Sequence, residues 1–239
     1  MVVAGGSASR FGRPKQFVTL AGKPVLWWSV AAARSACDGV VVVVPAGADG
    51  ADGADPTADP APDRTDRPTG DLPPVPDADP PWGADRVVTG GATRSDSVRA
   101  GLAAVPEDAA VIVVHDAARP LAPPALFGAV VAVVAAGDAD GAIPVVPVTD
   151  TLKRVDGSEV VATVDREGLV AVQTPQAFAA AVLRRAHASG GEATDDAGLL
   201  EALGATVRTV AGDPVNLKLT HPADLAVAEA LLPTPGVGR

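Results

Sequence analysis

The amino-acid sequence predicts an α/β protein with a mainly parallel sheet and helices on both faces. Short runs of valine and isoleucine recur along the 239 residues, and helix-like segments lie between them. These runs are continuous rather than alternating in polarity, which is typical of strands that are buried on both faces. Glycine-rich or charged motifs follow three of the runs, where a sheet of this kind binds ligands at the carboxyl ends of its strands.

The strands and helices are expected to alternate from the first residue onward. Strand-like runs occupy residues 1–4, 39–44, 86–89, 110–114 and 141–144. The first run is short, because only three residues stand between Met1 and Gly5. Helix-like segments occupy residues 25–35, 94–104, 124–135, 177–188 and 195–203. This order favours crossover connections between parallel strands, which place helices on the faces of the sheet.

Residues 148–174 depart from this alternation. The segments 151–155 and 160–164 flank the dipeptide Asp156-Gly157, a pattern that predicts a β-hairpin with a tight turn. The polar faces of the hairpin and its place in the chain suggest an arm that projects from the sheet. We expect this arm to contact a second copy of the chain and so to support a homodimer.

Residues 46–85 differ in composition from the rest of the chain. They contain nine of the 23 prolines, and their ten aspartates and two arginines account for −8 of the net charge of −10. A segment with so little apolar mass cannot offset the entropy of ordering, so we predict a disordered insertion within one domain of residues 1–239. An acidic docking loop is the less favoured interpretation.

Bulk composition excludes several classes of protein. Hydrophobic residues make up 47% of the chain, yet no apolar run approaches the roughly 20 residues that a membrane span needs. No signal peptide is recognisable. The single cysteine, Cys37, excludes an internal disulfide and favours the cytoplasm. Outside residues 46–85 the chain is nearly neutral, which argues against nucleic-acid binding.

The segment after the first strand contains small residues and then two basic ones. Gly5 and Gly6 are followed by small residues, and then by Arg10 and Lys15. Backbone N–H groups approach an anion closely where no Cβ intervenes, and the two cations can neutralise phosphate charge. The spacing matches neither a P-loop nor a dinucleotide-binding motif, so a triphosphate loop and a plain tight turn with surface cations both stay open.

A second glycine pair precedes the predicted helix 94–104. Gly90 and Gly91 lead into a segment rich in hydroxyl groups that includes Thr93, Ser95 and Ser97. These groups suit contacts to a base or ribose through Ser97. Simple capping of the helix by Thr93 or Ser95 explains them about as well.

The segment His-Asp-Ala-Ala-Arg-Pro, residues 115–120, follows a predicted buried strand. Asp116 can bind a substrate hydroxyl or a metal-associated water, and Arg119 can fork onto a phosphate. A local ion pair between the two is the alternative. We interpret His115 as a packing or hydrogen-bonding residue rather than a base. Lys218, in an apolar stretch predicted as a strand, is either a snorkelling edge residue or a third cation for a phosphate.

Taken together, these motifs resemble the 2-C-methyl-D-erythritol 4-phosphate cytidylyltransferase family. The resemblance spans nearly the whole chain outside residues 46–85 and rests on an ordered set: Gly5-Gly6-x-x-x-Arg10, Pro14-Lys15-Gln16, Gly90-Gly91-x-x-Arg94-x-x-Ser97-Val98, His115-Asp116-Ala117-Ala118-Arg119-Pro120, Asp150-Thr151-Leu152-Lys153, Val164-Asp165-Arg166, Gln173-Thr174-Pro175-Gln176, Thr194-Asp195-Asp196-Ala197 and Asn216-Leu217-Lys218. It implies a Rossmann-like fold of the nucleotidyltransferase type. It also implies transfer of a cytidylyl group from CTP to methylerythritol phosphate, with release of pyrophosphate, in isoprenoid precursor biosynthesis.

The resemblance implies a role for each matched residue. The catalytic cations at the triphosphate would be Arg10, Lys15 and Lys218. The residues around cytosine and ribose would be Ala4, Gly5, Gly6, Gly91 and Ser97. The acceptor would be bound by Asp116, Arg119, Thr151 and Thr194, while the arm would carry Arg166 and Thr174 into the partner subunit's site. Mg²⁺, or another divalent cation, would be held largely by the triphosphate, with Asp116 acting through water.

Other interpretations share parts of this pattern. A cytidylyltransferase acting on ribitol phosphate or another polyol phosphate would use the same CTP loop. A nucleotide-binding protein without turnover is the alternative from another class. The glycine spacing disfavours an NAD-dependent oxidoreductase. One departure from the family pattern is Ala92, which stands where an acidic residue is common.

Overall fold

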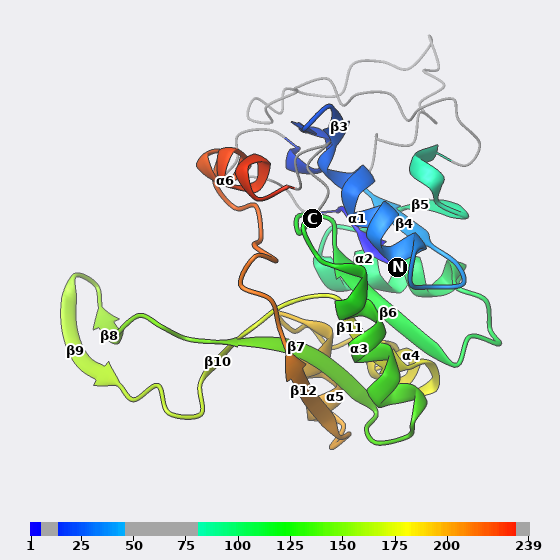
Figure 1. Ribbon diagram of the computed structural model, residues 1–239. Coiled ribbons are helices and arrows are strands. Elements are labelled where there is room, and N and C mark those ends of the chain that lie inside the picture. The colour runs from blue at the N-terminus through cyan, green and yellow to red at the C-terminus, as the bar shows by residue number, and fades with distance from the viewer. Residues whose placement is uncertain (6–13, 46–80, 233–239) are drawn as a thin grey trace, which may run out of the picture.

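The computed structural model describes residues 1–5, 14–45 and 81–232, and Figure 1 shows their arrangement. Its central feature is an eight-stranded sheet with the order β10-β7-β11-β6-β1-β4-β5, in which β12 also pairs with β7. Strands β1 (Val2–Val3), β4 (Val41–Val44), β5 (Arg86–Thr89) and β6 (Val111–Asp116) pair in parallel. The predicted α/β class with a mainly parallel sheet is confirmed.

The short first strand holds the centre of the sheet. Val2 and Val3 pair with β4 on one side and with β6 on the other. The contacts continue beyond both ends, because the Met1 carbonyl accepts from the His115 N–H at 3.0 Å and the Ala4 N–H donates to the Val43 carbonyl at 2.7 Å. Two residues of regular strand are therefore enough to fix the position of Gly5.

The other half of the sheet contains the strands that run against the parallel set. Strand β7 (Gly141–Pro147) pairs in parallel with β12 (Val207–Ala211). It pairs antiparallel with β10 (Val170–Val172) and with β11 (Gln176–Ala179), and β11 also pairs antiparallel with β6. Strands β10 and β12 lie outside the predicted set. The helix expected from residue 177 starts later, because residues up to Ala179 belong to β11.

Helices cover both faces of the sheet, as the sequence predicts. Helices α1 (Val25–Arg34) and α3 (Pro124–Ala135) pack on the face that carries Val2, Val42 and Val113. Helices α2 (Arg94–Ala104), α4 (Ala180–Ala188) and α5 (Asp196–Ala202) pack on the opposite face, with Val3 and Val43. Adjacent valines thus enter opposite core layers, which explains why the strands are apolar at every position.

Three short elements and the last helix form a smaller unit above the sheet. The 3₁₀ helix η1 (Lys15–Phe17) leads into the antiparallel pair β2 (Thr19–Leu20) and β3 (Lys23–Pro24). Helix α6 (Ala223–Leu231) lies against them, and a cluster of buried residues joins the two parts: Leu20, Val25, Leu219 and Ala228. Among the described residues, no helix is long and apolar enough to cross a bilayer.

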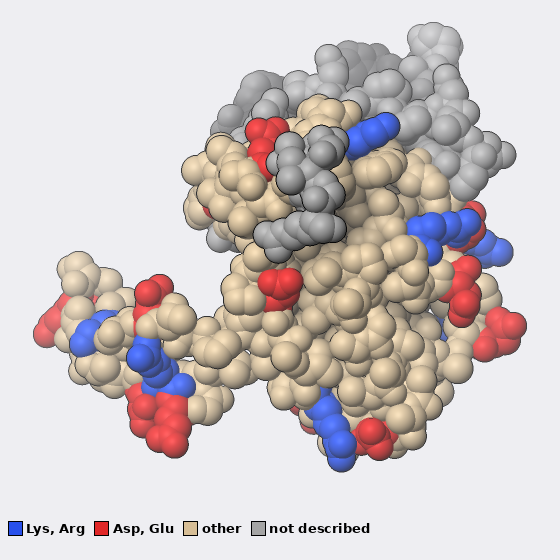
Figure 2. Space-filling model, viewed as in Figure 1, with Lys and Arg blue, Asp and Glu red and all other residues tan. Residues whose placement is uncertain are grey.

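Strands β8 (Leu152–Asp156) and β9 (Glu159–Val164) form the predicted hairpin. It extends away from the body of the molecule (Figure 1). The turn lies one residue later than expected, since Asp156 pairs with Glu159 and Gly157 takes a φ of +55°. Charged side chains of both signs gather on this arm, whereas the face of the body in view is largely uncharged (Figure 2).

The proline-rich segment predicted over residues 46–85 lies mostly outside the described residues, which resume at Pro81. Its last five residues are part of the packed structure. A 3₁₀ helix, η2 (Pro81–Gly83), places the Trp82 ring 6.0 Å from the Phe17 ring, between centroids. Ala84 is fully buried, and the Asp85 carboxylate accepts from the Val40 N–H at 2.7 Å. These contacts anchor the return of the chain into β5.

Candidate functional site

The predicted motifs meet at one edge of the sheet. Because β1, β4, β5 and β6 are parallel, their carboxyl ends share an edge. Gly5 follows β1 closely, Gly90 comes directly after β5, and Asp116 is the last residue of β6. Ligands of open α/β sheets bind at this edge.

Two glycines and a serine form one end of the site. Ser97 is fully buried, and its hydroxyl donates to the Thr93 carbonyl at 3.0 Å. A Cβ on Gly5 would lie 2.7 Å from Ser97 Oγ, and one on Gly90 would lie 2.6 Å from the same atom. Only glycine permits this approach, so the backbone after β1 and the backbone after β5 both lie against Ser97.

Helix α2 starts at this edge because of its cap. The Thr93 hydroxyl oxygen accepts from the Asp96 N–H at 3.0 Å, and the Asp96 carboxylate accepts from the Thr93 N–H at 3.1 Å. This capping box fixes the first turn of the helix. The packing around Gly91 is equally tight, since a Cβ there would lie 2.2 Å from Asp96 Cβ. Of the two predicted caps, Thr93 is the one used, and Arg94 becomes the first helical residue.

Asp116 is the electrostatic centre of the site. Lys218 Nζ lies 2.6 Å from its Oδ2, and Arg94 Nε lies 3.7 Å from its Oδ1. Burial of this side chain, which is 13% exposed, would raise the pKa of Asp116, but the charges of Lys218 and Arg94 outweigh it and lower the pKa to about 2. The carboxylate is therefore ionised at neutral pH.

A series of hydrogen bonds through Thr174 and His115 fixes the backbone of Asp116. The Asp116 N–H donates to Thr174 Oγ1 at 3.0 Å, and the Thr174 hydroxyl lies 3.0 Å from His115 Nδ1. His115 Nε2 lies 3.2 Å from the Arg119 carbonyl oxygen. Burial lowers the pKa of His115 to about 4, so the ring is neutral: Nδ1 accepts from Thr174 and Nε2 donates to the Arg119 carbonyl. His115 is a hydrogen-bonding residue, as the sequence suggested.

Arg119 does not form the local ion pair that the sequence left open. Its guanidinium donates to two backbone carbonyls instead, that of Asn216 at 2.7 Å and that of Val172 at 3.3 Å. Asp116 pairs with Lys218 and Arg94. Arg119 thus ties the end of β6 to the C-terminal segment that carries Lys218.

That C-terminal segment, residues 216–220, brings two predicted cations together. It is not the strand that was expected, because it has no regular secondary structure. Asn216 is fully buried and donates to the Thr174 carbonyl at 2.9 Å. Lys15 Nζ, from η1, donates to the Leu219 carbonyl at 2.7 Å. Lys218 belongs to this short stretch of chain, and Lys15, from the other end of the sequence, is hydrogen-bonded to it.

Comparison with known proteins gives a consistent result. Residues 82–234 match the family model described as IspD: 2-C-methyl-D-erythritol 4-phosphate cytidylyltransferase. The chain is 45% identical over 237 residues to the 2-C-methyl-D-erythritol 4-phosphate cytidylyltransferase of Nocardia farcinica, covering 97% of this chain and 92% of that one. It is 44% identical to that of Rhodococcus jostii, with 97% and 93% covered. The chain belongs to this family.

A solved structure agrees with the assignment to the cytidylyltransferase family. The crystal structure of 2-C-methyl-D-erythritol 4-phosphate cytidylyltransferase from Thermus thermophilus aligns with a TM-score of 0.71 and 36% identity, over 96% of each chain. The Francisella tularensis structure has the same TM-score at 23% identity, over 97% of this chain and 98% of that one, and it supports the fold. The Rossmann-like nucleotidyltransferase fold implied by the motifs is thereby confirmed.

The structure gathers most of the predicted cytidylyltransferase residues at the sheet edge. Ala4, Gly5, Gly91 and Ser97 lie at the β1 and β5 end, and Asp116, Arg119 and Lys218 lie at the β6 end. Lys15 joins them through Leu219. Gly6 and Arg10 fall outside the described residues.

Thr174 needs a correction. It was expected on the arm, reaching the partner subunit's site, but it is buried beside Asp116 and His115 of its own chain. The reason is that the chain rejoins the central sheet at β10, which pairs with β7, so Gln173 already lies in the body and its N–H donates to the Pro144 carbonyl at 2.8 Å. Thr174 therefore helps to build the site in its own chain.

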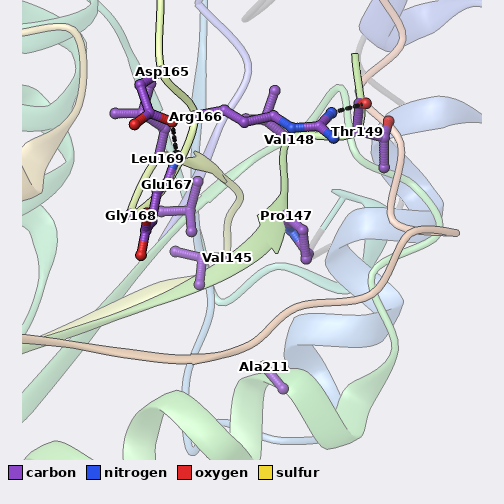
Figure 3. Close-up of a pocket in the computed structure, with 11 residues that line it drawn as sticks. Val145, Pro147, Val148, Thr149, Asp165, Arg166, Glu167, Gly168, Leu169 and Ala211 are labelled. Carbon is purple, nitrogen blue, oxygen red and sulfur yellow. Dashed lines mark hydrogen bonds between the residues drawn. The ribbon is translucent and has the colours of Figure 1, made fainter. Parts of the chain in front are cut away.

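Thr151 and Arg166 do lie on the arm. Thr151 is exposed directly before β8, and Arg166 follows β9. The Arg166 guanidinium donates to the Thr149 carbonyl, and Figure 3 shows the side chain extending across to that residue. Arg166 and Thr149 line an open hollow of about 910 Å³ at the base of the arm. Thr194 is exposed in the loop just before α5, next to the cap residue Asp195.

Three residues of the site carried no assigned role in the sequence analysis. Arg94 Nη2 lies 2.8 Å from Asp196 Oδ2, and His187 Nε2 lies 2.9 Å from Asp196 Oδ1. Burial would raise the pKa of Asp196, but the hydrogen bond from His187 and the charge of Arg94 lower it. Arg94 and Asp196 both stand inside quoted motifs, next to residues that received roles. That adjacency was the available signal, whereas nothing in the sequence pointed to His187.

The described residues of the site offer a divalent cation one carboxylate, that of Asp116, rather than a full set of ligands. Among the described residues, no group of three or more His, Cys, Asp or Glu side chains could hold a metal ion. Asp116 offers one ionised carboxylate at the site. Mg²⁺ is usually bound by one or two carboxylates together with substrate phosphates, so this donor fits an ion that is held mainly by a nucleotide.

Proposed function

We propose that this chain transfers a cytidylyl group from CTP to 2-C-methyl-D-erythritol 4-phosphate, giving 4-diphosphocytidyl-2-C-methyl-D-erythritol and pyrophosphate, in isoprenoid precursor biosynthesis. Membership of the family supports the reaction. The observation that carries it to this site is the meeting of Lys15 and Lys218 at residues 216–220, with Asp116 alongside. Two cations and one carboxylate suit a triphosphate and a polyol phosphate that must lie side by side.

The reaction needs positioning more than covalent chemistry. An oxygen of the acceptor phosphate attacks the α-phosphorus of CTP, and the bond from that phosphorus to the bridging oxygen of pyrophosphate breaks. The attacking oxygen is already anionic, so no base has to remove a proton. Negative charge grows on the leaving pyrophosphate, and the ammonium groups of Lys15 and Lys218 stabilise it, together with Arg10.

The nucleotide is proposed to bind at the β1 and β5 end. Gly5 and Gly91 provide close backbone approach, and Ser97 packs against Gly5. The resemblance to the family assigns Ala4 and Gly6 to the same pocket. The contacts around Ser97 leave no space for a side chain at Gly5, so the backbone after β1 stays close to the start of α2.

The acceptor is proposed to bind at the β6 end. The ionised carboxylate of Asp116 suits the hydroxyl groups of a polyol, and the Arg119 guanidinium lies nearby on the same turn. Thr194, exposed before α5, is proposed to reach the same acceptor. Mg²⁺ or another divalent cation would be held by the phosphates of CTP, with Asp116 contributing through water. It would supply further positive charge to the triphosphate.

The arm is proposed to complete the site of a partner subunit in a homodimer. Its exposed apolar side chains support this, because Val155, Val160 and Val161 are 57%, 58% and 53% exposed. A contact with a second chain would cover them. Thr151 and Arg166, at the two ends of the hairpin, would then approach the partner's acceptor. We propose the cytoplasm as the compartment, in line with the single cysteine, Cys37.

Release of pyrophosphate from CTP and Mg²⁺ tests the proposal, with methylerythritol phosphate and ribitol phosphate supplied in parallel. Release with methylerythritol phosphate is expected. Release with ribitol phosphate alone would refute the acceptor, and CTP binding without release would favour a non-catalytic nucleotide-binding protein. Lys15→Ala is expected to lower turnover by about 100-fold or more while the chain stays folded. Lys23→Ala, at an exposed lysine of β3, is the matched control and should keep full turnover.

Mixing two inactive variants tests the shared site. Arg166→Ala removes the arm residue and Lys15→Ala removes the triphosphate cation. In a mixed dimer, one of the two sites has both residues intact. Partial recovery of turnover on mixing is expected, and no recovery under conditions of subunit exchange would argue against the arm acting in trans.

A further inference from the structure

A chain of charged and polar side chains runs from the site into the helical layer beneath it. Arg94 is the first residue of α2, Asp196 the first residue of α5, and His187 lies in the last turn of α4. Arg94 Nη2 is 2.8 Å from Asp196 Oδ2, and His187 Nε2 is 2.9 Å from Asp196 Oδ1. The side chains of Asp196 and His187 are 1% and 2% exposed, so this pair is shielded from water.

The hydrogen bonds in this group have one consistent direction. An ionised carboxylate only accepts, so His187 Nε2 carries a proton and donates to Asp196. Arg94 donates to the other oxygen of the same carboxylate. Both oxygens of Asp196 are thus occupied by donors from α4 and α2, and the guanidinium plane of Arg94 is fixed from behind.

The front of the Arg94 guanidinium faces Asp116. The two oxygens of Asp116 have different cations: Lys218 lies 2.6 Å from Oδ2 and Arg94 Nε lies 3.7 Å from Oδ1. The Lys218 side chain is 46% exposed and lies on an irregular segment, while that of Arg94 is 27% exposed and is anchored to Asp196. Lys218 can therefore turn toward a ligand, whereas Arg94 is held beside Asp116 by Asp196.

This difference matters for the proposed reaction, on which the inference rests. When the triphosphate binds, Lys218 is needed at the phosphates, so its contact with Asp116 weakens. Without a second cation, Asp116 would then be a largely buried carboxylate with no charge partner, and it would lose its orientation toward the acceptor hydroxyls.

We propose that Arg94 is a positioning residue that holds Asp116 ready for the polyol acceptor while Lys218 serves the triphosphate, and that Asp196 and His187 hold Arg94 in position. Arginine suits this task because its planar guanidinium presents donors in two directions at once. Nη2 addresses Asp196 and Nε faces Asp116. A lysine carries all its donors on a single nitrogen, so it lacks the separate donor atoms that Arg94 directs to the two carboxylates.

Steady-state pyrophosphate release by the full-length protein, with each substrate varied in turn, tests this role. Arg94→Gln is expected to raise the KM for methylerythritol phosphate about tenfold or more and to leave the KM for CTP within about twofold. Arg94→Lys should recover part of the loss by restoring the charge. Arg99→Gln is the matched control, since Arg99 lies on the same helix and pairs with Asp96 at 2.6 Å. It should leave both KM values unchanged.

Asp196→Asn tests whether the support acts through Arg94. It should also raise the KM for the acceptor, and the double variant with Arg94→Gln should be no worse than Arg94→Gln alone. His187→Phe removes the donor to Asp196 and is used if Asp196→Asn does not fold; it should also raise the KM for the acceptor. Losses that multiply in the double variant, or a KM for CTP that rises as much as that for the acceptor, would overturn the inference and leave the proposed function intact.

A wild-type protein that releases no pyrophosphate with any acceptor would instead overturn the proposed function. A cycle of urea-unfolding measurements with Arg94→Gln, Asp116→Asn and their combination then decides the inference separately. A coupling between the two substitutions is expected from their contact, and additive effects would overturn the positioning of Asp116 by Arg94.

Discussion

The carboxylate of Asp116 makes the stability of this chain depend on pH in a way that can be worked out from its surroundings. Its pKa in the folded chain is about 2, against an ordinary value of 3.8. A group with a lowered pKa stabilises the fold above its unfolded pKa, and this contribution is lost as the pH falls through the folded value. A pKa difference of one unit is worth about 1.4 kcal/mol. The difference between the folded and the unfolded pKa of Asp116 therefore stabilises the fold by about 2 kcal/mol at neutral pH, and about 1 kcal/mol of this stabilisation is lost by about pH 3.

Asp116→Asn replaces the titrating carboxylate by a neutral amide. Lys218 and Arg94 then lie near each other without the negative charge that separates them in the wild type. At neutral pH the variant is expected to be less stable than the wild type by about 2 kcal/mol or more. The gap between the two proteins should narrow by about 1 kcal/mol on acidification from about pH 6 to about pH 3. Other groups with lowered pKa values, such as Asp196, are present in both proteins and cancel in the comparison.

Urea unfolding followed by tryptophan fluorescence gives the free energy of unfolding of both proteins across this pH range, in the absence of nucleotide and metal. Asp138→Asn is the control, because Asp138 is exposed in the turn after α3. It tests the loss of one surface carboxylate. A difference in unfolding free energy between the wild type and Asp116→Asn that stayed constant with pH, or grew toward acid, would refute this reasoning. Lys218 and Arg94 would then not be the partners of an ionised Asp116.

Three further substitutions test other parts of the structure. Gly5→Ala places a Cβ 2.7 Å from Ser97 Oγ, and the shift this overpacking forces on the backbone should weaken CTP binding about tenfold by calorimetry. An unchanged affinity would show that the packing of Gly5 against Ser97 does not shape the nucleotide site. Thr93→Ala removes the cap of α2 and is expected to cost about 1 kcal/mol in urea unfolding. Phe127→Ala removes a fully buried ring packed on His115 and is expected to cost about 3–5 kcal/mol, and a loss under about 1 kcal/mol would contradict the packing.

The sequence predicted the fold well where local pattern and tertiary environment agree. Continuous apolar runs predicted β4 and β6 because these strands are covered on both faces, and α2 and α3 have the predicted limits. Strand β5 was predicted from Val87 and Val88, which are only half-buried. Strand β10 was missed because its apolar run lies inside the segment interpreted as the arm, and β12 was missed because polar residues interrupt it. The sequence pattern also extended the predicted helix α4 into β11, because Gln176–Ala179 has helix-compatible residues and is a strand only through its pairing with β6 and β7.

The site was predicted in part. Residues that follow strands, such as Gly5 and Asp116, could be placed together because parallel strands end at one edge. Residues that act from the second layer could not, because the contact between Arg94 and Asp196 joins positions 102 apart in sequence. Thr174 was misplaced for a related reason: the chain leaves the arm and rejoins the sheet at β10, and no local pattern marks that point.

The position of Lys15 and Lys218, the cations proposed for the triphosphate, depends on a part of the molecule that lies away from the sheet. Lys15 Nζ is held by the backbone carbonyl of Leu219, and the Leu219 side chain is fully buried with Leu20, Val25 and Ala228. Lys218 precedes Leu219, so the same buried leucine anchors the backbone beneath both cations. The Lys15 ammonium donates to a carbonyl of this segment, and the Lys218 ammonium pairs with the Asp116 carboxylate, so each cation is held by a different partner. The hydrophobic contact of α6 with β2 thus places positive charge at the edge of a sheet to which neither element belongs.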